Sequence, residues 1–330
     1  MENLLTDHLI ITIPASTTCR YIVTTDTHID HPEEFTTGLL ATNTPVTAQQ
    51  SADLLRQAID TSQLRIHSHP ADISPCRAEL ASIAATMDEH ERLMSASRHI
   101  VIDSEATPSQ QPQQARSTRA IARALANATD GQLADPYTAQ LVRPDLRVDG
   151  EREWFCPADG WLGIDCRINP DGGMDTSGST ECECLCLFTR GLSRFGLPEL
   201  TIDRVACDYD LAATNAMRGL AVQLLGQLWA NPGARELRLD PEVAVEPEDV
   251  WAYWAARPLF GHPVPLHLTP ANRDDLPTET THLELRPRPD YPGTRPQWSA
   301  QVLNHGVSTV AGWQPDTPPQ RIDRQPATSG

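Results

Sequence analysis

The sequence lacks lysine altogether, because all 26 of its basic side chains are arginine. Without a lysine amine the chain has no Schiff-base residue, no P-loop lysine and no Ser-x-x-Lys nucleophile. This absence excludes pyridoxal-phosphate enzymes, P-loop NTPases and ordinary kinases. The motifs G-x-G-x-x-G, G-x-S-x-G, H-E-x-x-H and C-x-x-C are missing as well, so the sequence matches none of the common catalytic templates that they mark.

Long apolar runs are also missing, and aromatic residues make up only 5% of the chain. No run approaches the roughly 18 to 20 apolar residues that a membrane span requires. The first residues, MENLLTDHLIITIP, lack the basic region and long apolar core of a signal peptide. We therefore expect a cytoplasmic protein whose eight cysteines are reduced thiols. Its core must rest mainly on Leu, Ile, Val and Ala.

Positive charge is scarce relative to negative charge, since the formal net charge is −18 and the pI is about 4.9. A chain with no basic stripe is repelled by nucleic-acid backbones and by anionic membranes. The composition therefore predicts neither a nucleic-acid partner nor a membrane partner. A basic protein or a cationic small ligand is the partner that this charge favours, and the oligomeric state is left open.

The pattern of apolar residues predicts an α+β fold. Period-two alternation predicts strands at 9–13, 20–25, 64–67, 99–103, 161–168, 182–188, 201–205 and 236–240, and short edge strands at 264–268, 282–286 and 297–303. Helical spacing predicts helices over 48–60, 74–94, 115–129 and 210–230 and a short one from Pro247. The order strand, helix, Gly turn, strand occurs near 99–142 and again near 201–239, which indicates ferredoxin-like or split β-α-β units, either single or duplicated.

Changes in composition divide the chain into four segments. Residues 1–148 are expected to form one α+β unit, with a polar linker at 104–114, and residues 149–245 a second unit packed on the first. Residues 246–314 are rich in proline, which disfavours long helices and central strands, and they are expected to form a β extension. Residues 315–330 are expected to be a disordered tail.

The segment Ile66 to Leu80, IHSHPADISPCRAEL, carries the clearest candidate for a metal site. Two histidines at positions i and i+2 of a strand project from one face and can bind one ion. The segment resembles the JAMM metalloprotease signature, in which H-S-H-P precedes a Ser and a metal-binding Asp. His67 and His69 match the metal ligands, but Cys76 replaces the Ser and Glu79 replaces the Asp.

The JAMM resemblance implies a zinc-dependent hydrolase with zinc as its cofactor. Glu33 or Glu34 would then be the upstream base that activates the metal-bound water. The alternative is purely structural, because Ser74-Pro75 is a good N-cap and first-turn pair for a helix. On that interpretation the segment binds no metal and no cofactor is expected.

Two other clusters contain residue types that bind metals. The segment Asp26 to His31, DTHIDH, resembles the H-x-H-x-D-H motif of metallo-β-lactamase-like hydrolases, with Asp26 in place of the first His. Its downstream partners are not recognisable, so a polar turn is the preferred interpretation. Cys182, Cys184 and Cys186 alternate on a strand, where the outer two would lie about 13 Å apart, too far for one zinc. Buried thiols are expected there instead.

The segment Thr189 to Leu200, TRGLSRFGLPEL, is the most distinctive in the sequence. It resembles the signature T-x-G-(M/L)-x-x-F-G-x-P-E-(I/L) of a bacterial, actinobacterial-type family of unknown function. The matching residues are Thr189, Gly191, Leu192, Phe195, Gly196, Pro198, Glu199 and Leu200. The resemblance covers residues 75–240; it implies an α+β fold and no established activity.

Arg190, Arg194 and Glu199 are the candidate binding residues of this segment. If their side chains project together from the turn, they form a binding site. If the glycines serve only to adopt positive φ and Glu199 only accepts backbone amides, the signature is a structural feature. The leading hypothesis is a binding or regulatory protein, with immunity proteins as one example, and the zinc-dependent hydrolase is the alternative.

Overall fold

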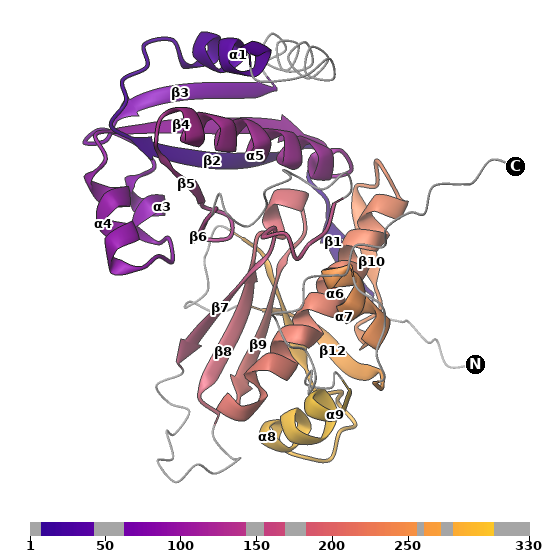
Figure 1. The fold of residues 1–330 in the computed structure, drawn as a ribbon. Coiled ribbons are helices and arrows are strands. Elements are labelled where there is room, and N and C mark those ends of the chain that lie inside the picture. Colours follow the sequence, from indigo (N-terminus) through magenta and orange to yellow (C-terminus); the bar gives the residue numbers. More distant parts are fainter. Residues whose placement is uncertain are drawn as a thin grey trace, which may run out of the picture.

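A computed structural model describes residues 8–42, 63–142, 155–168, 183–255, 261–271 and 280–306. Two sheets, one above the other in Figure 1, account for most of the strands, and helices pack against both. The α+β class expected from the sequence is confirmed. The expected helix at 48–60 and the tail from 315 lie outside the described residues. Within these residues no helix is long and apolar enough to span a membrane.

The first sheet has the strand order β3-β4-β2-β5-β6, and all neighbours are antiparallel. Its strands are β2 (Thr17–Thr25), β3 (Leu64–Pro70), β4 (Arg98–Ala106), β5 (Gln132–Asp135) and β6 (Gln140–Leu141). The chain passes from β2 through α1 (Pro32–Thr42) to β3, and these two strands flank β4. It passes from β4 through α5 (Gln111–Ala128) to β5, which lies on the far side of β2. Both connections are therefore split β-α-β connections.

The central strands of this sheet carry buried apolar side chains on both faces, and helices cover each face. Tyr21 and Ile102 belong to the same buried cluster as Leu125 of α5. Ile22 and Val101, which point the opposite way because successive strand residues alternate, belong to a cluster with Leu80 and Leu93. Those two leucines come from α3 (Arg77–Ala81) and α4 (Met87–Ser95). Full burial of one such apolar side chain contributes about 1.5–3 kcal/mol to folding.

The second sheet has a different order, β11-β12-β13-β9-β8-β7, so it is not a copy of the first. Its strands are β7 (Gly163–Ile168), β8 (Leu185–Arg190), β9 (Glu199–Val205), β11 (Glu242–Val245), β12 (Val264–Ala271) and β13 (His282–Arg286). All neighbours are antiparallel except β13 and β9, which are parallel. Strands β12 and β13, from the proline-rich segment, thus belong to the same sheet as β9. The segment boundary expected at residue 246 therefore falls between β11 and β12, which are neighbouring strands of one sheet.

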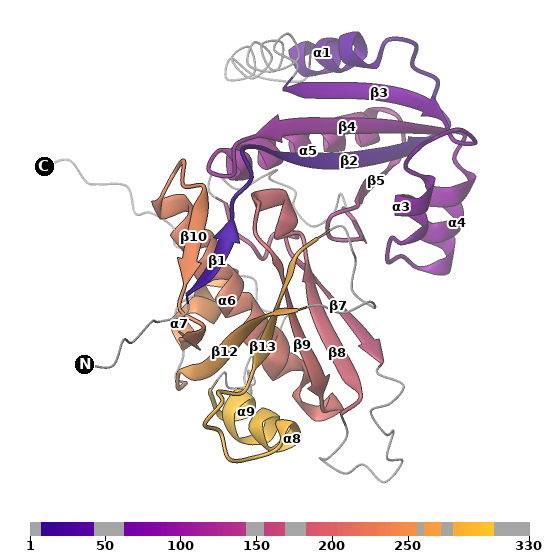
Figure 2. The same ribbon diagram turned by 180° about the vertical axis from the view of Figure 1, so that it is seen from behind.

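Helix α6 (Asp210–Ala230) is packed along the second sheet (Figure 1) and is apolar on most of its circumference. Buried residues include Met217, Leu220 and Leu224, because α7 (Pro247–Trp254) also packs against the helix. A separate two-stranded sheet pairs β1 (Leu9–Thr12) with β10 (Glu236–Leu239), which Figure 2 shows beside α6. Buried apolar residues of both large sheets form one continuous core.

Three expectations about local structure were wrong. The expected strand at 297–303 is helical, made of α8 (Arg295–Trp298) and η4 (Ser299–Leu303), followed by α9 (Asn304–Gly306). Thr294 begins α8 with a capping box, which the strand-like alternation concealed. The expected helix over 74–94 is two helices, because Thr86 starts α4 with a second capping box.

The third wrong expectation is the polar linker at 104–114. Strand β4 continues to Ala106 and α5 begins at Gln111. The Gln111 side chain is buried, and its Nε2 donates to the carbonyl oxygen of Thr17 at 3.1 Å. A polar composition here reflects a hydrogen-bonded contact between α5 and β2 and not a solvated linker.

Candidate functional site

Glu199 organises the turn between β8 and β9. Its Oε1 accepts hydrogen bonds from the backbone N–H groups of Gly191 and Ser193, both at 2.9 Å. Its Oε2 accepts from the Thr189 hydroxyl at 2.7 Å, and that hydroxyl oxygen accepts from the Leu200 amide at 2.7 Å. The residue is only 4% exposed. Every contact holds the turn closed, so the signature residue Glu199 has a structural role.

The two signature glycines are required by backbone geometry. Gly191 has φ 108°, and a Cβ placed there would lie 2.5 Å from the carbonyl oxygen of Trp161. Gly196 has φ 80° and ends the short helical turn η2 (Ser193–Phe195). Only glycine adopts such angles without strain. Of the two roles considered for this segment, the structural one describes Gly191, Gly196 and Glu199.

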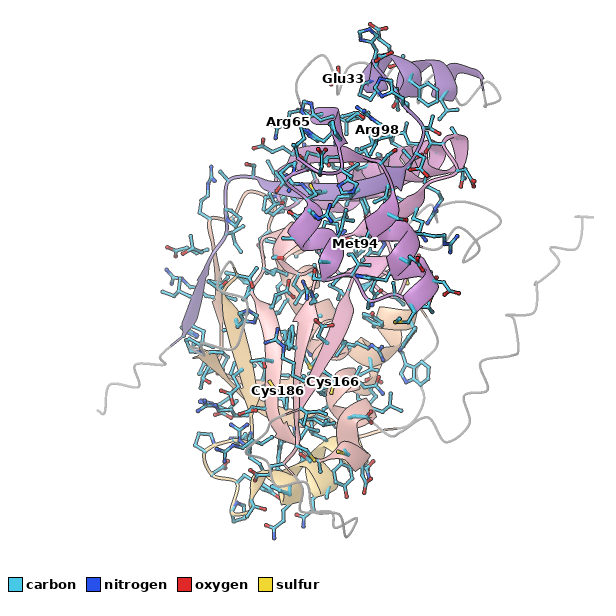
Figure 3. The ribbon with its side chains drawn as sticks, turned by 90° about the vertical axis from the view of Figure 1, so that its left-hand side faces the viewer. Glu33, Arg65, Met94, Arg98, Cys166 and Cys186 are labelled. Carbon is cyan, nitrogen blue, oxygen red and sulfur yellow. The ribbon has the colours of Figure 1, made fainter. Side chains whose placement is uncertain are left out.

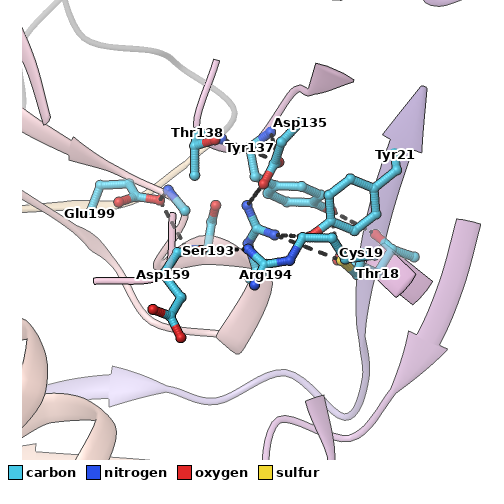
Figure 4. A network of polar contacts seen from close by, with 12 residues as sticks. Thr18, Cys19, Tyr21, Asp135, Tyr137, Thr138, Asp159, Ser193, Arg194 and Glu199 are labelled. Carbon is cyan, nitrogen blue, oxygen red and sulfur yellow. Dashed lines mark hydrogen bonds and ion pairs between the residues drawn. The ribbon is translucent and has the colours of Figure 1, made fainter. Parts of the chain in front are cut away.

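Arg194 joins this turn to the first sheet (Figure 4). The side chain is fully buried, and its Nη2 donates to both carboxylate oxygens of Asp135, at 2.9 and 2.7 Å. Its Nη1 donates to the Tyr21 hydroxyl at 3.2 Å. Burial opposes the charged form of the guanidinium, but Asp135, Tyr21 and Cys19 together outweigh burial, and the pKa of Arg194 stays above its ordinary value. Arg194, a candidate binding residue of the signature segment, therefore lies buried in this ion pair and does not project from the turn beside Arg190.

Burial also raises the pKa values of two side chains that contact Arg194. Desolvation raises the pKa of Cys19 to about 11 and raises that of Tyr21 well above its ordinary value. Both groups are therefore neutral at pH 7, and they leave the single negative charge of Asp135 to balance Arg194. The cluster is an anchor between the two sheets and has no exposed reactive atom.

A cavity of about 360 Å³ lies beside this anchor, between the two sheets. We call it the inter-sheet cavity. The first sheet and its helices contribute Thr18, Arg20, Glu79, Ser82, Pro136 and Tyr137, and the second sheet contributes Thr189, Arg190, Ser193, Glu199, Thr280 and His282. The candidate binding residues Arg190 and Glu199 thus reach one cavity, whereas Arg194 lies behind its wall.

The two arginines that line the inter-sheet cavity differ in how many of their donor atoms have a hydrogen-bond partner. Arg20 donates to both oxygens of Asp103, at 2.7 and 3.1 Å, and to Glu79 Oε1 at 3.0 Å. Arg190 donates through Nη1 to Asp165 at 3.0 Å. Its Nε and Nη2 have no hydrogen-bond partner within the part of the chain that the structure describes. Spare donor capacity in the cavity is therefore concentrated on Arg190.

Two hydroxyl groups and a histidine complete the wall. The Tyr137 hydroxyl donates to the Thr18 carbonyl at 2.7 Å, and burial raises the pKa of Tyr137. His282 Nε2 lies 3.0 Å from the Thr280 hydroxyl. These groups can both donate and accept hydrogen bonds, which suits a polar ligand.

A second hollow, of about 490 Å³, lies beside β3 and the start of α1. We call it the histidine hollow. It gathers both histidine-rich motifs and both candidate base residues, since its lining includes His28, Asp30, His31, Glu33, Glu34, His67, His69 and Arg98. Figure 3 shows Glu33 on the α1 side and Arg65 and Arg98 on the nearby strands. The ring centroids of His67 and His69 are 6.2 Å apart.

The predicted metal ligands are not brought together. His67 and His69 line the histidine hollow, whereas Glu79 lies in the inter-sheet cavity, paired with Arg20 at 3.0 Å. Among the described residues, no group of three or more His, Cys, Asp and Glu side chains is arranged to hold a metal ion. Glu79, which replaces the JAMM Asp, lies in the first turn of α3 and is held there by its ion pair with Arg20.

The remaining motif residues have local roles. Asp26 Oδ1 accepts from the Ser97 amide at 2.8 Å, and His28 pairs with Asp30 at 2.8 Å in an exposed turn. Cys184 and Cys186 are buried, as expected. Cys182 lies outside the described residues.

The chain matches no family model, no curated protein and no solved structure. The resemblance to the bacterial signature family therefore stays a prediction.

Sequence reasoning missed Tyr137 and His282, which line the inter-sheet cavity, and Asp135, which holds Arg194 in the neighbouring anchor. These residues lie in no motif, and the cavity and the anchor form only because two sheets approach each other. Asp135 had one local signal: it ends a short apolar run and precedes Pro136, a position where strands stop. That signal predicts a turn and gives no indication of the partner Arg194.

Proposed function

We propose that the protein binds a small polar ligand in the inter-sheet cavity and acts as a binding or regulatory protein. The observation that carries this proposal is the spare donor capacity of Arg190 inside a cavity walled by both sheets. Its volume of about 360 Å³ falls in the range of small-molecule sites. The cytoplasmic location expected from the sequence belongs to the same proposal.

A zwitterion such as an amino acid is the ligand class that this cavity favours. Arg190 can donate two hydrogen bonds to a carboxylate, and Glu79 offers a negative charge for an ammonium group on the opposite wall. The side chains that line the cavity include two arginines and two glutamates. A ligand without net charge is also not repelled by a protein of formal charge −18.

Calorimetric titration of the full chain tests this proposal. The panel contains neutral amino acids, dicarboxylates and diamines of similar size, and binding is expected from the amino acids. Arg190→Gln removes a charge-assisted hydrogen bond and should weaken binding about tenfold or more. Arg238→Gln is the matched control, since Arg238 is an exposed arginine on β10. Binding that survives Arg190→Gln, or a panel with no binder, would contradict the proposal.

The zinc-dependent hydrolase is kept as a second candidate because both histidine motifs and both candidate bases line one hollow. Metal analysis of protein purified without added zinc tests it. Near-stoichiometric zinc that is lost in His67→Ala but kept in His90→Ala would support a zinc site. A folded, metal-free chain with no peptidase activity would eliminate this candidate. If zinc is bound, Glu33→Gln and Glu34→Gln would show which residue is the base, because loss of the base lowers activity and leaves the zinc in place.

A further inference from the structure

Two cysteines meet at the ends of neighbouring strands in the second sheet. Cys184 precedes β8 and Cys207 follows β9, and their sulfur atoms are 3.2 Å apart. Cys184 is only 4% exposed, whereas Cys207 is exposed. A buried thiol in contact with an accessible one is the arrangement in which the accessible thiol reacts first and the buried one follows.

The backbone is shaped to bring these thiols together. Leu187 pairs with Ile202, but Leu185 pairs with Val205, so β9 contains one extra residue over this interval. Within the interval Arg204 has φ 56°, a left-handed conformation that is uncommon outside glycine. Such a bulge bends one strand and redirects the residues beyond it. Cys184 and Cys207 lie just past this bulge, where their side chains are in contact.

We propose that Cys184 and Cys207 form a reversible disulfide with a low-molecular-weight disulfide as oxidant. The Cys207 thiolate attacks one sulfur of the oxidant, forms a mixed disulfide and releases the first small thiolate, which takes up a proton. Cys184 then loses its proton and attacks the Cys207 sulfur, which releases the second small thiol. Each protein sulfur loses one electron and each sulfur of the oxidant gains one, so the exchange balances.

The charge around Cys207 selects the oxidant. Asp208 and Asp210 follow Cys207 in the chain, and Glu183, which precedes Cys184, is paired with Arg204 at 3.4 Å, so carboxylates outnumber arginines around the two thiols. Anionic disulfides are repelled by these carboxylates, whereas a cationic one such as cystamine is attracted. We therefore infer faster oxidation by cystamine than by glutathione disulfide, with a rate difference that shrinks as salt is added.

Oxidation would link β8 and β9 covalently at the end of the hairpin opposite the signature turn. Strands β8 and β9 carry Thr189, Arg190 and Glu199 at one end and the two thiols at the other. Cys166 is the nearest competitor, because it is exposed on β7 and interacts electrostatically with Cys207. Figure 3 places Cys166 and Cys186 on this same sheet.

Peptide mapping of the full chain tests the proposal. Fully reduced protein is treated with cystamine, capped with iodoacetamide and cleaved after arginine. The expected product links the peptides 168–190 and 205–218, and it disappears when a thiol reductant is added before capping. Because the first peptide also contains Cys182 and Cys186, Cys186→Ser is the matched control and should leave the linkage intact.

Two variants separate the roles of the thiols. Cys184→Ser should stop the reaction at a mixed disulfide on Cys207, and Cys207→Ser should lose both that adduct and the linkage. Cys166→Ser should change neither. A stable mixed disulfide on the unmodified chain, or a linkage that persists in Cys184→Ser, would overturn the proposal. So would equal oxidation rates with cystamine and glutathione disulfide in low salt.

Discussion

The inter-sheet cavity and the histidine hollow contain similar side chains, but the protein holds them differently. Arg20 and Glu199, which line the cavity, each make three hydrogen bonds to defined partners. In the hollow, His67 and His69 are partly or largely exposed, and the pair His28–Asp30 is solvated. The histidine spacing that resembles metal-binding motifs therefore marks the loosely held region, whereas the closely held region combines part of the Thr189–Leu200 signature with residues such as Tyr137 and His282 that lie in no motif.

The largest expected effect is loss of the Arg194 anchor. Arg194→Met leaves the Asp135 carboxylate buried without its partner, which should lower the free energy of unfolding by about 3–5 kcal/mol. Urea unfolding measures the change. The double variant Arg194→Met with Asp135→Asn removes both charges and should recover part of the stability. If the double variant is as unstable as the single one, the ion pair is not the source of the loss.

A smaller loss is expected at Glu199. Glu199→Gln replaces one carboxylate oxygen with an N–H₂ group that cannot accept from a backbone amide or from Thr189 as now arranged. An unsatisfied buried group costs about 1–3 kcal/mol. Chemical denaturation should show this decrease for Glu199→Gln and almost none for the exposed control Glu236→Gln. Equal stability of the two variants would mean that the turn is held by its glycines alone.

An acid-sensitive contribution is expected from His99, which lies on β4 opposite His69 of the histidine hollow. This residue is 1% exposed, neither ring nitrogen has a hydrogen-bond partner within the described segments, and burial, with Arg77 and His69 nearby, lowers its pKa. The folded chain therefore binds this proton less readily than the unfolded chain. The free energy of unfolding should not depend on the titration of His99 above about pH 6.5. Below that pH it should fall as the pH drops towards the lowered pKa of His99, with a slope of at most about 1.4 kcal/mol per pH unit.

The His99 expectation is checked by urea unfolding at pH values from about 7.5 to about 5. His99→Leu removes the titrating group and should flatten this part of the profile. The exposed control His28→Leu should leave the slope unchanged. A wild-type slope that persists in His99→Leu would assign the acid sensitivity to another group.

The smallest effect is expected in the histidine hollow. His67→Ala removes an exposed side chain with no hydrogen bond to a described residue, so the free energy of unfolding should change by less than about 0.5 kcal/mol. Thermal unfolding with and without a chelator measures both the change and any metal contribution. A large loss, or a loss that only the chelator produces, would reverse the comparison between the two regions.

Local patterns of apolar residues predicted most helices and strands but not which of them contact one another. Alternation in the segments that became β4 and β9 and the apolar run of α6 are strong, and these elements are found where the sequence placed them. The helix at 295–303 was missed because its alternation resembles a strand, and only the Thr294 capping box marks it as helical. The pairing of Arg194 with Asp135 depends on the approach of two sheets, which no local pattern encodes.

The parallel pairing of β9 with β13 also has a consequence for folding during synthesis. His282 of β13 pairs with Glu199 of β9. The edge of β9 that does not pair with β8 therefore has no partner until β13 has been synthesised. Contacts between residues this far apart form slowly, because a long loop must close first. Until then the exposed edge of β9 is a template for pairing with other chains. A chain that ends before β12 is therefore expected to aggregate, although it contains the complete signature turn.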